Sequence, residues 1–135
     1  MAWIEPKTDW TFADYFNAED YNRIIGNINH LKTLAGDLFY GLSILSTSEE
    51  KTVMSLIYAR EMNDIENALE SLNMETYGLK IGDKQTFKAN GSTPLWSEFN
   101  RIESAILLLY NTMVVHKDNL PRLAFRLGNQ KGIRV

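Results

Sequence analysis

Apolar and polar positions recur in the same order at three places along this chain. The stretches DYNRII, EMNDIE and EFNRIE each place an asparagine after a large apolar residue and two positions before an isoleucine. Aligned on Asn22, Asn63 and Asn100, the apolar positions of every copy follow a spacing of 3, 4 and 3 residues. This spacing predicts an amphipathic helix, and three copies predict a three-helix bundle. The predicted repeat core consists of Tyr21, Ile24, Ile28, Leu31, Met62, Ile65, Leu69, Leu72, Phe99, Ile102, Ile106 and Leu109.

Capping signals next to the apolar stretches indicate where these helices begin. Asn17 is followed by acidic residues, which is typical of an N-cap and a first helical turn. The letters TSEE offer a capping box for the second helix, and Thr93 precedes a proline at the start of the third. The helices are therefore predicted over residues 18–38, from within 46–55 to 73, and 94–115.

Segments outside the helices are predicted to be extended. The aromatic-rich N-terminus is expected to pack its rings on the bundle, and alternation in GLKIGDKQTF predicts a β-hairpin. Near the C-terminus, alternating Leu123, Phe125 and Leu127 predict a strand that pairs with this hairpin or with a partner chain. The fold class is thus mainly α. The predicted single domain, 1–135, comprises an extended arm (1–17), a three-helix bundle (18–117) with a hairpin around 79–88, and a basic strand or tail (118–135).

The third predicted helix is apolar on nearly every face, most densely between Ala105 and Tyr110. Such a helix is buried on every side. Either the arm and hairpin cover it, or its outer face meets another subunit. Candidate interaction residues on these segments are Trp3, Trp10, Leu108, Val115, Arg122, Phe125 and Arg126.

Charge is distributed unevenly along the chain. The net charge is −3, but residues 117–135 hold five basic residues against one acidic residue, which is +4 and leaves −7 for the rest. A basic tail can indicate nucleic acid. An acidic protein surface would suit the same charges, and the tail lacks interleaved aromatic residues. Nucleic acid is therefore the weaker interpretation.

Composition narrows the class of protein further. Cysteine is absent, which excludes disulfides and thiolate metal sites. The chain has no run of about 18 apolar residues and no signal-peptide pattern, so we expect no membrane span and synthesis in a cytosol.

The sequence contains none of the common catalytic or metal-binding motifs. His30 and His116 lie 86 positions apart with no neighbouring histidine. The sequence contains no HExxH, EF-hand, Walker A or GxSxG pattern. We therefore predict no catalytic residues, metal, cofactor or enzymatic activity.

The polar residues of the repeat have two interpretations. The repeated asparagines either bond to a neighbouring loop or helix end, which we favour, or recognise the backbone of a partner. Charged pairs at helical spacing, such as Glu19 with Arg23 and Glu98 with Arg101, are expected on solvated faces.

The repeat also resembles a known family. Trp10-Thr11, Asn17 through Asp20 and Asn22-Arg23-Ile24 are similar to phrases in small structural proteins of tailed phages and prophages of Gram-positive bacteria. Those proteins lie in tail, baseplate and fibre gene modules. The family's usual Asn-Arg-Ile-Glu is broken by Ile25 in the first copy and restored by Glu103 in the third. IGDKQTF, NGSTP and LAF-x-LGN add to the resemblance, which covers most of the chain.

The resemblance implies a non-enzymatic virion protein at the tail tip, baseplate or fibre attachment. Its expected partners are other tail proteins and further copies of itself, and its expected location is the virion, after synthesis in the host cytoplasm. Two alternatives remain: a DNA-binding or packaging accessory protein, and a small lysis-related enzyme.

Overall fold

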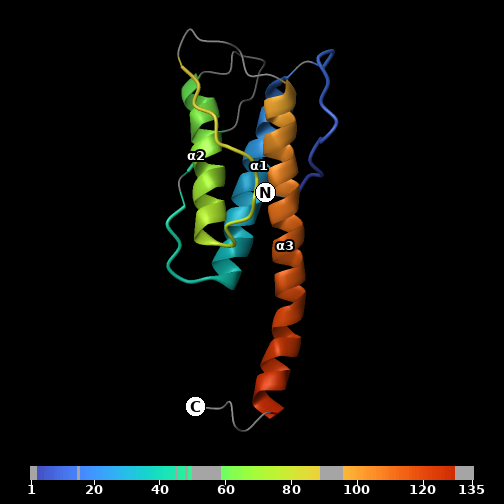
Figure 1. Ribbon diagram of the computed structural model, residues 1–135, viewed down its shortest axis with the longest axis vertical. Helices are drawn as coiled ribbons and strands as arrows, with labels where there is room; N and C mark the ends of the chain where they lie inside the picture. The colour runs from blue at the N-terminus through green and yellow to red at the C-terminus, as the bar shows by residue number, and fades with distance from the viewer. Residues whose placement is uncertain are drawn as a thin grey trace.

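Three helices that run in the same direction form the body of the protein (Figure 1). The computed structural model describes residues 3–14, 16–44, 46–47, 49, 59–88 and 96–129, of which 121–129 are described by backbone alone. The helices are α1 (Ala18–Leu38), α2 (Ala59–Glu75) and α3 (Trp96–Asn129). In Figure 1 the segment that follows α2 returns along the bundle towards the beginning of the helices.

Local chemistry explains the ends of α1 and α2. Asn17 accepts a hydrogen bond from the Asp20 amide, and the Asp20 carboxylate accepts one from the Asn17 amide. This capping box begins α1 as predicted, and α1 ends at the predicted Leu38. Beyond α2, Gly78 has a φ of 62° and its amide donates to the carbonyl of Asn73, which terminates the helix. The predicted beginnings of the second and third helices lie outside the described residues or at their margin.

One hydrophobic core joins the three helices. The structure buries all twelve residues of the predicted repeat core, and Ile24, Ile65 and Ile102 belong to the same cluster. Trp10 from the N-terminal segment and Met113 from α3 extend this core. Burial of each large side chain contributes about 1.5–3 kcal/mol.

The two predicted β elements are wrong where the structure describes them. Residues 79–88 contain no strand; their main chain bonds to helix side chains instead of to a second strand. Residues 123–127 are helical, because α3 continues to Asn129 rather than ending near Val115. The alternation there spans only five residues, whereas a longer sevenfold spacing of Ile106, Met113, Leu120 and Leu127 favours a continuous helix.

The continuation of α3 gives the molecule its shape. Helix α3 has 34 residues against 21 in α1 and 17 in α2, and its C-terminal part projects past their ends (Figure 1). No helix within the described part of the chain is both long and apolar enough to cross a membrane.

Candidate functional site

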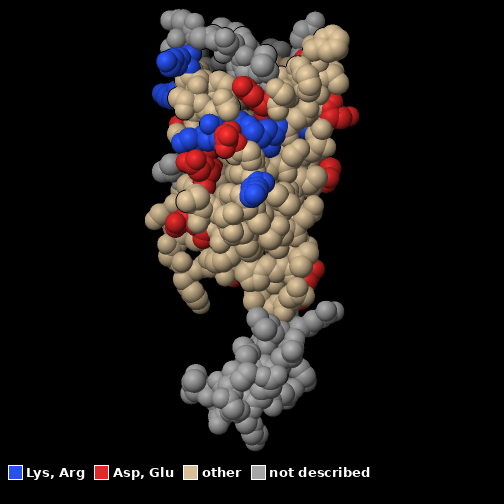
Figure 2. Space-filling view, viewed as in Figure 1, with Lys and Arg blue, Asp and Glu red and all other residues tan. Residues whose placement is uncertain are grey.

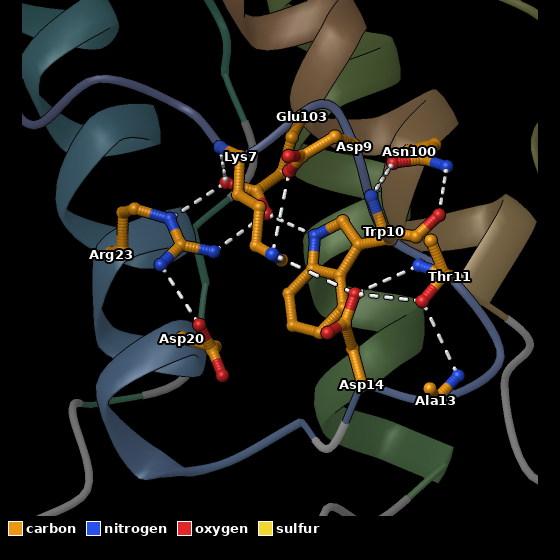
Figure 3. A network of polar contacts seen from close by, with 10 residues as sticks. All are labelled: Lys7, Asp9, Trp10, Thr11, Ala13, Asp14, Asp20, Arg23, Asn100 and Glu103. Carbon is orange, nitrogen blue, oxygen red and sulfur yellow. Dashed lines mark hydrogen bonds and ion pairs between the residues drawn. The ribbon is translucent and has the colours of Figure 1, made fainter.

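The most buried charged group is the carboxylate of Glu103 in α3, which is 0% exposed. Its Oε1 accepts hydrogen bonds from Arg23 Nε at 2.8 Å and from the Lys7 amide at 3.0 Å. Its Oε2 accepts from Arg23 Nη2 at 2.7 Å and from the Trp10 indole Nε1 at 2.6 Å (Figure 3). Glu103 therefore joins α1, α3 and the N-terminal segment through one carboxylate.

The cation in this network is Arg23, whose second partner is Asp20. Arg23 Nη1 donates to Asp20 Oδ1 at 2.9 Å. Burial opposes the charge on Arg23, but hydrogen bonds and charge attraction from Glu103 and Asp20 outweigh it and raise the pKa of the guanidinium. The guanidinium thus keeps its charge although it is partly buried, because carboxylates accept hydrogen bonds from it.

A second arginine–glutamate pair repeats this arrangement between α3 and α2. Arg101 Nη1 donates to Glu66 Oε1 at 3.0 Å, and Arg101 Nη2 donates to Glu66 Oε2. Each arginine directly follows a repeat asparagine, and each glutamate lies three residues after one. The repeat therefore carries matched polar pairs, with Arg23 bound to Glu103 and Arg101 bound to Glu66. The expectation that these arginines lie on solvated faces is wrong.

Four asparagine side chains bind the extended segments to the helices. Each accepts a hydrogen bond from the amide of one extended residue and donates one to the carbonyl of that same residue, at 2.7–3.0 Å. These bonds satisfy main-chain groups that no strand pairs with. The interpretation of the repeat asparagines as ligands of a neighbouring loop is confirmed for Asn63 and Asn100. The pairs are Asn27 with Ile4, Asn63 with Phe87, Asn73 with Leu79 and Asn100 with Trp10.

Rings of the N-terminal segment pack on the helices. The Trp3 ring stacks on Tyr110 with centroids 3.8 Å apart, and Phe16 stacks on Phe99 at 4.1 Å. Trp10 lies beside this second pair and is 3% exposed. The prediction of Trp10 as an interaction residue is therefore wrong, because its ring fills the core and its indole nitrogen donates to Glu103.

Polar residues at the rim of the network lie in solvent. Lys7 Nζ lies 3.4 Å from Asp9 and 3.6 Å from Asp14. Nearby atoms that remove water lower the pKa of Lys7, but the two carboxylates raise it by a larger amount in total. The hydrogen bond from the Thr11 amide, followed by the charge of Lys7, lowers the pKa of Asp14. These contacts fix the turn at residues 11–14.

The remaining candidate interaction residues lie on α3. Leu108 is 42% exposed and Val115 is 58% exposed, and the half-buried Leu107 and Val114 precede them. Positions seven residues apart lie on the same helix face. We call Leu107, Leu108, Val114 and Val115 the outer stripe. Arg122, Phe125 and Arg126 belong to the helical backbone of α3, and their side chains lie outside the described residues.

Both histidines lie among aromatic rings. His30 is near Trp3 and Tyr110, and His116 Nδ1 lies 2.8 Å from the Tyr77 hydroxyl. Among the described residues, no group of three His, Asp or Glu could hold a metal ion. No buried side-chain nitrogen or oxygen in the described part lacks a hydrogen-bond partner. The buried polar side chains of the described residues are therefore all hydrogen-bonded.

Sequence reasoning missed Glu66, Glu103, Asn27 and Asn73 as structural residues. A signal was present, since a glutamate follows the repeat asparagine by three positions in two of the three copies. No comparable spacing marks Asn27 and Asn73 across the copies. Comparisons with protein-family models, curated proteins and solved structures find no match for this chain.

Proposed function

We propose that this chain is a non-enzymatic structural protein of a tailed phage or prophage, which docks in several copies at the tail tip, baseplate or fibre attachment. It would be made in the host cytoplasm and reside in the virion tail. The observation that carries the proposal is the outer stripe, an apolar surface on a helix that also projects from the body.

The outer stripe suits docking because it is largely apolar and is held by a rigid helix. Single exposed apolar residues are ordinary on a protein surface. Here two apolar pairs recur seven residues apart on one helix face, on either side of the exposed Asn111. A helix held by a packed core presents such a strip with little loss of conformational entropy on binding.

Residues of the family-like phrase have structural roles in this chain, which supports the non-enzymatic part of the proposal. Trp10 fills the core, Asn17 caps α1 and Arg23 binds Glu103. Each of these side chains is hydrogen-bonded within the fold, to Glu103 or to the Asp20 amide. We therefore interpret the residues of this phrase as ones that stabilise the fold.

The N-terminal segment is proposed to act as the arm of this structural unit. Its main chain is bonded at Ile4, Lys7 and Trp10, and Pro6 is buried between them. Phe12, in contrast, is almost fully exposed in the turn before α1. An exposed phenylalanine at the edge of a fixed arm offers an additional contact to a neighbouring tail protein.

Immunogold electron microscopy of the phage particles tests the proposal. Purified particles should carry label at the tail end. Complementation with Val115→Asp should reduce the label, and Thr33→Asp, at an exposed position of α1, should not. Particles without label, with the protein free in the lysate, would contradict a virion role.

A further inference from the structure

The stripe of α3 that lines the core continues beyond the core. Its residues recur with heptad spacing, and the positions Ile106, Met113 and Leu120 are each seven apart. Met113 is 0% exposed, whereas Leu120 is 37% exposed. The C-terminal part of α3 projects past the ends of α1, at Leu38, and of α2, at Glu75 (Figure 1). The sequence extends the same heptad to Leu123 and Leu127 in the projecting helix.

The end of the bundle beside this projection carries negative charge. Because the helices are parallel, α1 and α2 both present their C-terminal carbonyls here, at the negative ends of their dipoles (Figure 1). Neither helix has a basic residue in its last turn, and Asp37 and Glu75 are exposed there. Exposed Tyr40 and Met74 add apolar surface to the same end. On the face shown in Figure 2, the lower part of the described surface is mainly uncharged.

The projecting part of α3 has the opposite charge. Between residues 117 and 129 the sequence holds Lys117, Arg122 and Arg126 against the single acidic residue Asp118. The helix from Lys117 to Asn129 is about 18 Å long at 1.5 Å per residue. It is therefore long enough for about two heptads of pairing with another helix.

We propose that two copies of this chain associate through the projecting halves of α3, packed antiparallel. Each projecting helix packs its heptad positions, beginning with Leu120, against those of the other. The antiparallel direction places the basic end of one helix beside the negative helix ends of the partner bundle. A parallel pair would instead set Lys117 against its own copy. The contact is two-fold and closed, so association stops at the dimer.

This dimer uses a different face from the outer stripe. Leu120 continues the core stripe, while Val115 points away from it at another heptad position. Self-association therefore does not depend on which tail proteins the outer stripe meets. The two proposals can fail separately.

Sedimentation equilibrium of the full chain, from low to high micromolar concentration, tests the dimer. The wild type should fit a monomer–dimer equilibrium. Leu120→Asp should raise the dissociation constant about tenfold or more, and Val115→Asp should leave it unchanged. Far-ultraviolet circular dichroism at the same concentrations checks that both variants stay folded. A monomer at every concentration, or equal effects of the two variants, would overturn the proposal.

The direction of pairing has its own test, since the chain contains no cysteine. A mixture of the single variants Asp37→Cys and Arg126→Cys should form a mixed disulfide under mild oxidation. A mixture of Asp37→Cys with Ser104→Cys, on an exposed α3 position within the bundle, serves as control and should not. Equal yields from both mixtures would overturn the antiparallel arrangement. The yield of mixed disulfide can be compared even if a variant is less stable, because the disulfide reports directly that the two positions lie close together.

Discussion

Arg23 of α1 and Glu103 of α3 are joined by two parallel hydrogen bonds, at 2.8 and 2.7 Å, although they lie 80 residues apart in the sequence. Two-point pairing fixes the relative rotation of the two helices as well as their distance. The carboxylate also accepts from Lys7 and Trp10, so the position of the N-terminal segment depends on the same group.

Arg23→Met is expected to destabilise the protein by about 3–5 kcal/mol, because it leaves the buried Glu103 carboxylate without its cation. Urea denaturation followed by tryptophan fluorescence measures the change in unfolding free energy. Asp9→Asn, at an exposed carboxylate paired with Lys7, is the control and should change the unfolding free energy by less than about 1 kcal/mol. Equal effects of the two substitutions would show that the buried pair adds nothing.

Asn100→Asp should destabilise the protein by about 1–3 kcal/mol. The aspartate can still accept from the Trp10 amide, but it cannot donate to the Trp10 carbonyl, which the asparagine reaches at 2.9 Å. Thermal unfolding compares it with Asn111→Asp, an exposed position on the same helix. An unchanged midpoint for Asn100→Asp would refute the role of the two-point bond.

The helical bundle was predictable because it rests on a repeated apolar spacing. Every copy places apolar residues at the same spacing of 3, 4 and 3, and burial of all twelve residues follows from that regularity. The end of α3 was not predictable in the same way. Pro121 lacks the amide of an internal helical residue, and five alternating residues favoured a strand. Heptad spacing over a longer window competes with both signals.

Gly82→Ala should destabilise the protein by about 1–3 kcal/mol. Gly82 has a φ of 87°, and an added Cβ would lie 2.7 Å from Arg101 Cδ. Arg101 cannot move away without losing its bonds to Glu66. Gly36→Ala is the control in α1, where an added Cβ meets no atom within 4 Å, and should stabilise by about 0.5–1 kcal/mol. Equal stability changes from the two substitutions, measured in urea, would contradict the close approach at Gly82.

The protein is expected to lose stability at alkaline pH because of Tyr77. Burial raises the pKa of its hydroxyl above the ordinary value of 10.0. The Tyr77 hydroxyl therefore ionises at a lower pH in the unfolded chain than in the folded protein. Its contribution to the unfolding free energy is complete below pH 10 and is lost as the pH rises from there towards the folded pKa. The unfolding midpoint of the wild type should fall more steeply above that pH than that of Tyr77→Phe. Parallel curves for the two proteins would contradict the prediction.

The polar site was only partly predictable. Asn63 and Asn100 were marked by the repeat, but Asn27 has no equivalent in the other copies and binds Ile4 from a segment without secondary structure. Glu103 belongs to the family-like phrase, but the sequence did not indicate its partner Arg23, which lies in another helix. Pairing between helices depends on their relative rotation, which periodicity in one helix does not define.

The central claim is that helix side chains hold the extended segments by their main chain. Native-state hydrogen exchange of the full chain, read by nuclear magnetic resonance, tests it most directly. The amides of Ile4, Lys7, Trp10, Leu79 and Phe87 should exchange far more slowly than those of the exposed Thr8 and Gln85, because side-chain oxygens of the helices accept from them. Exchange of all seven amides at the same unprotected rate would contradict the claim.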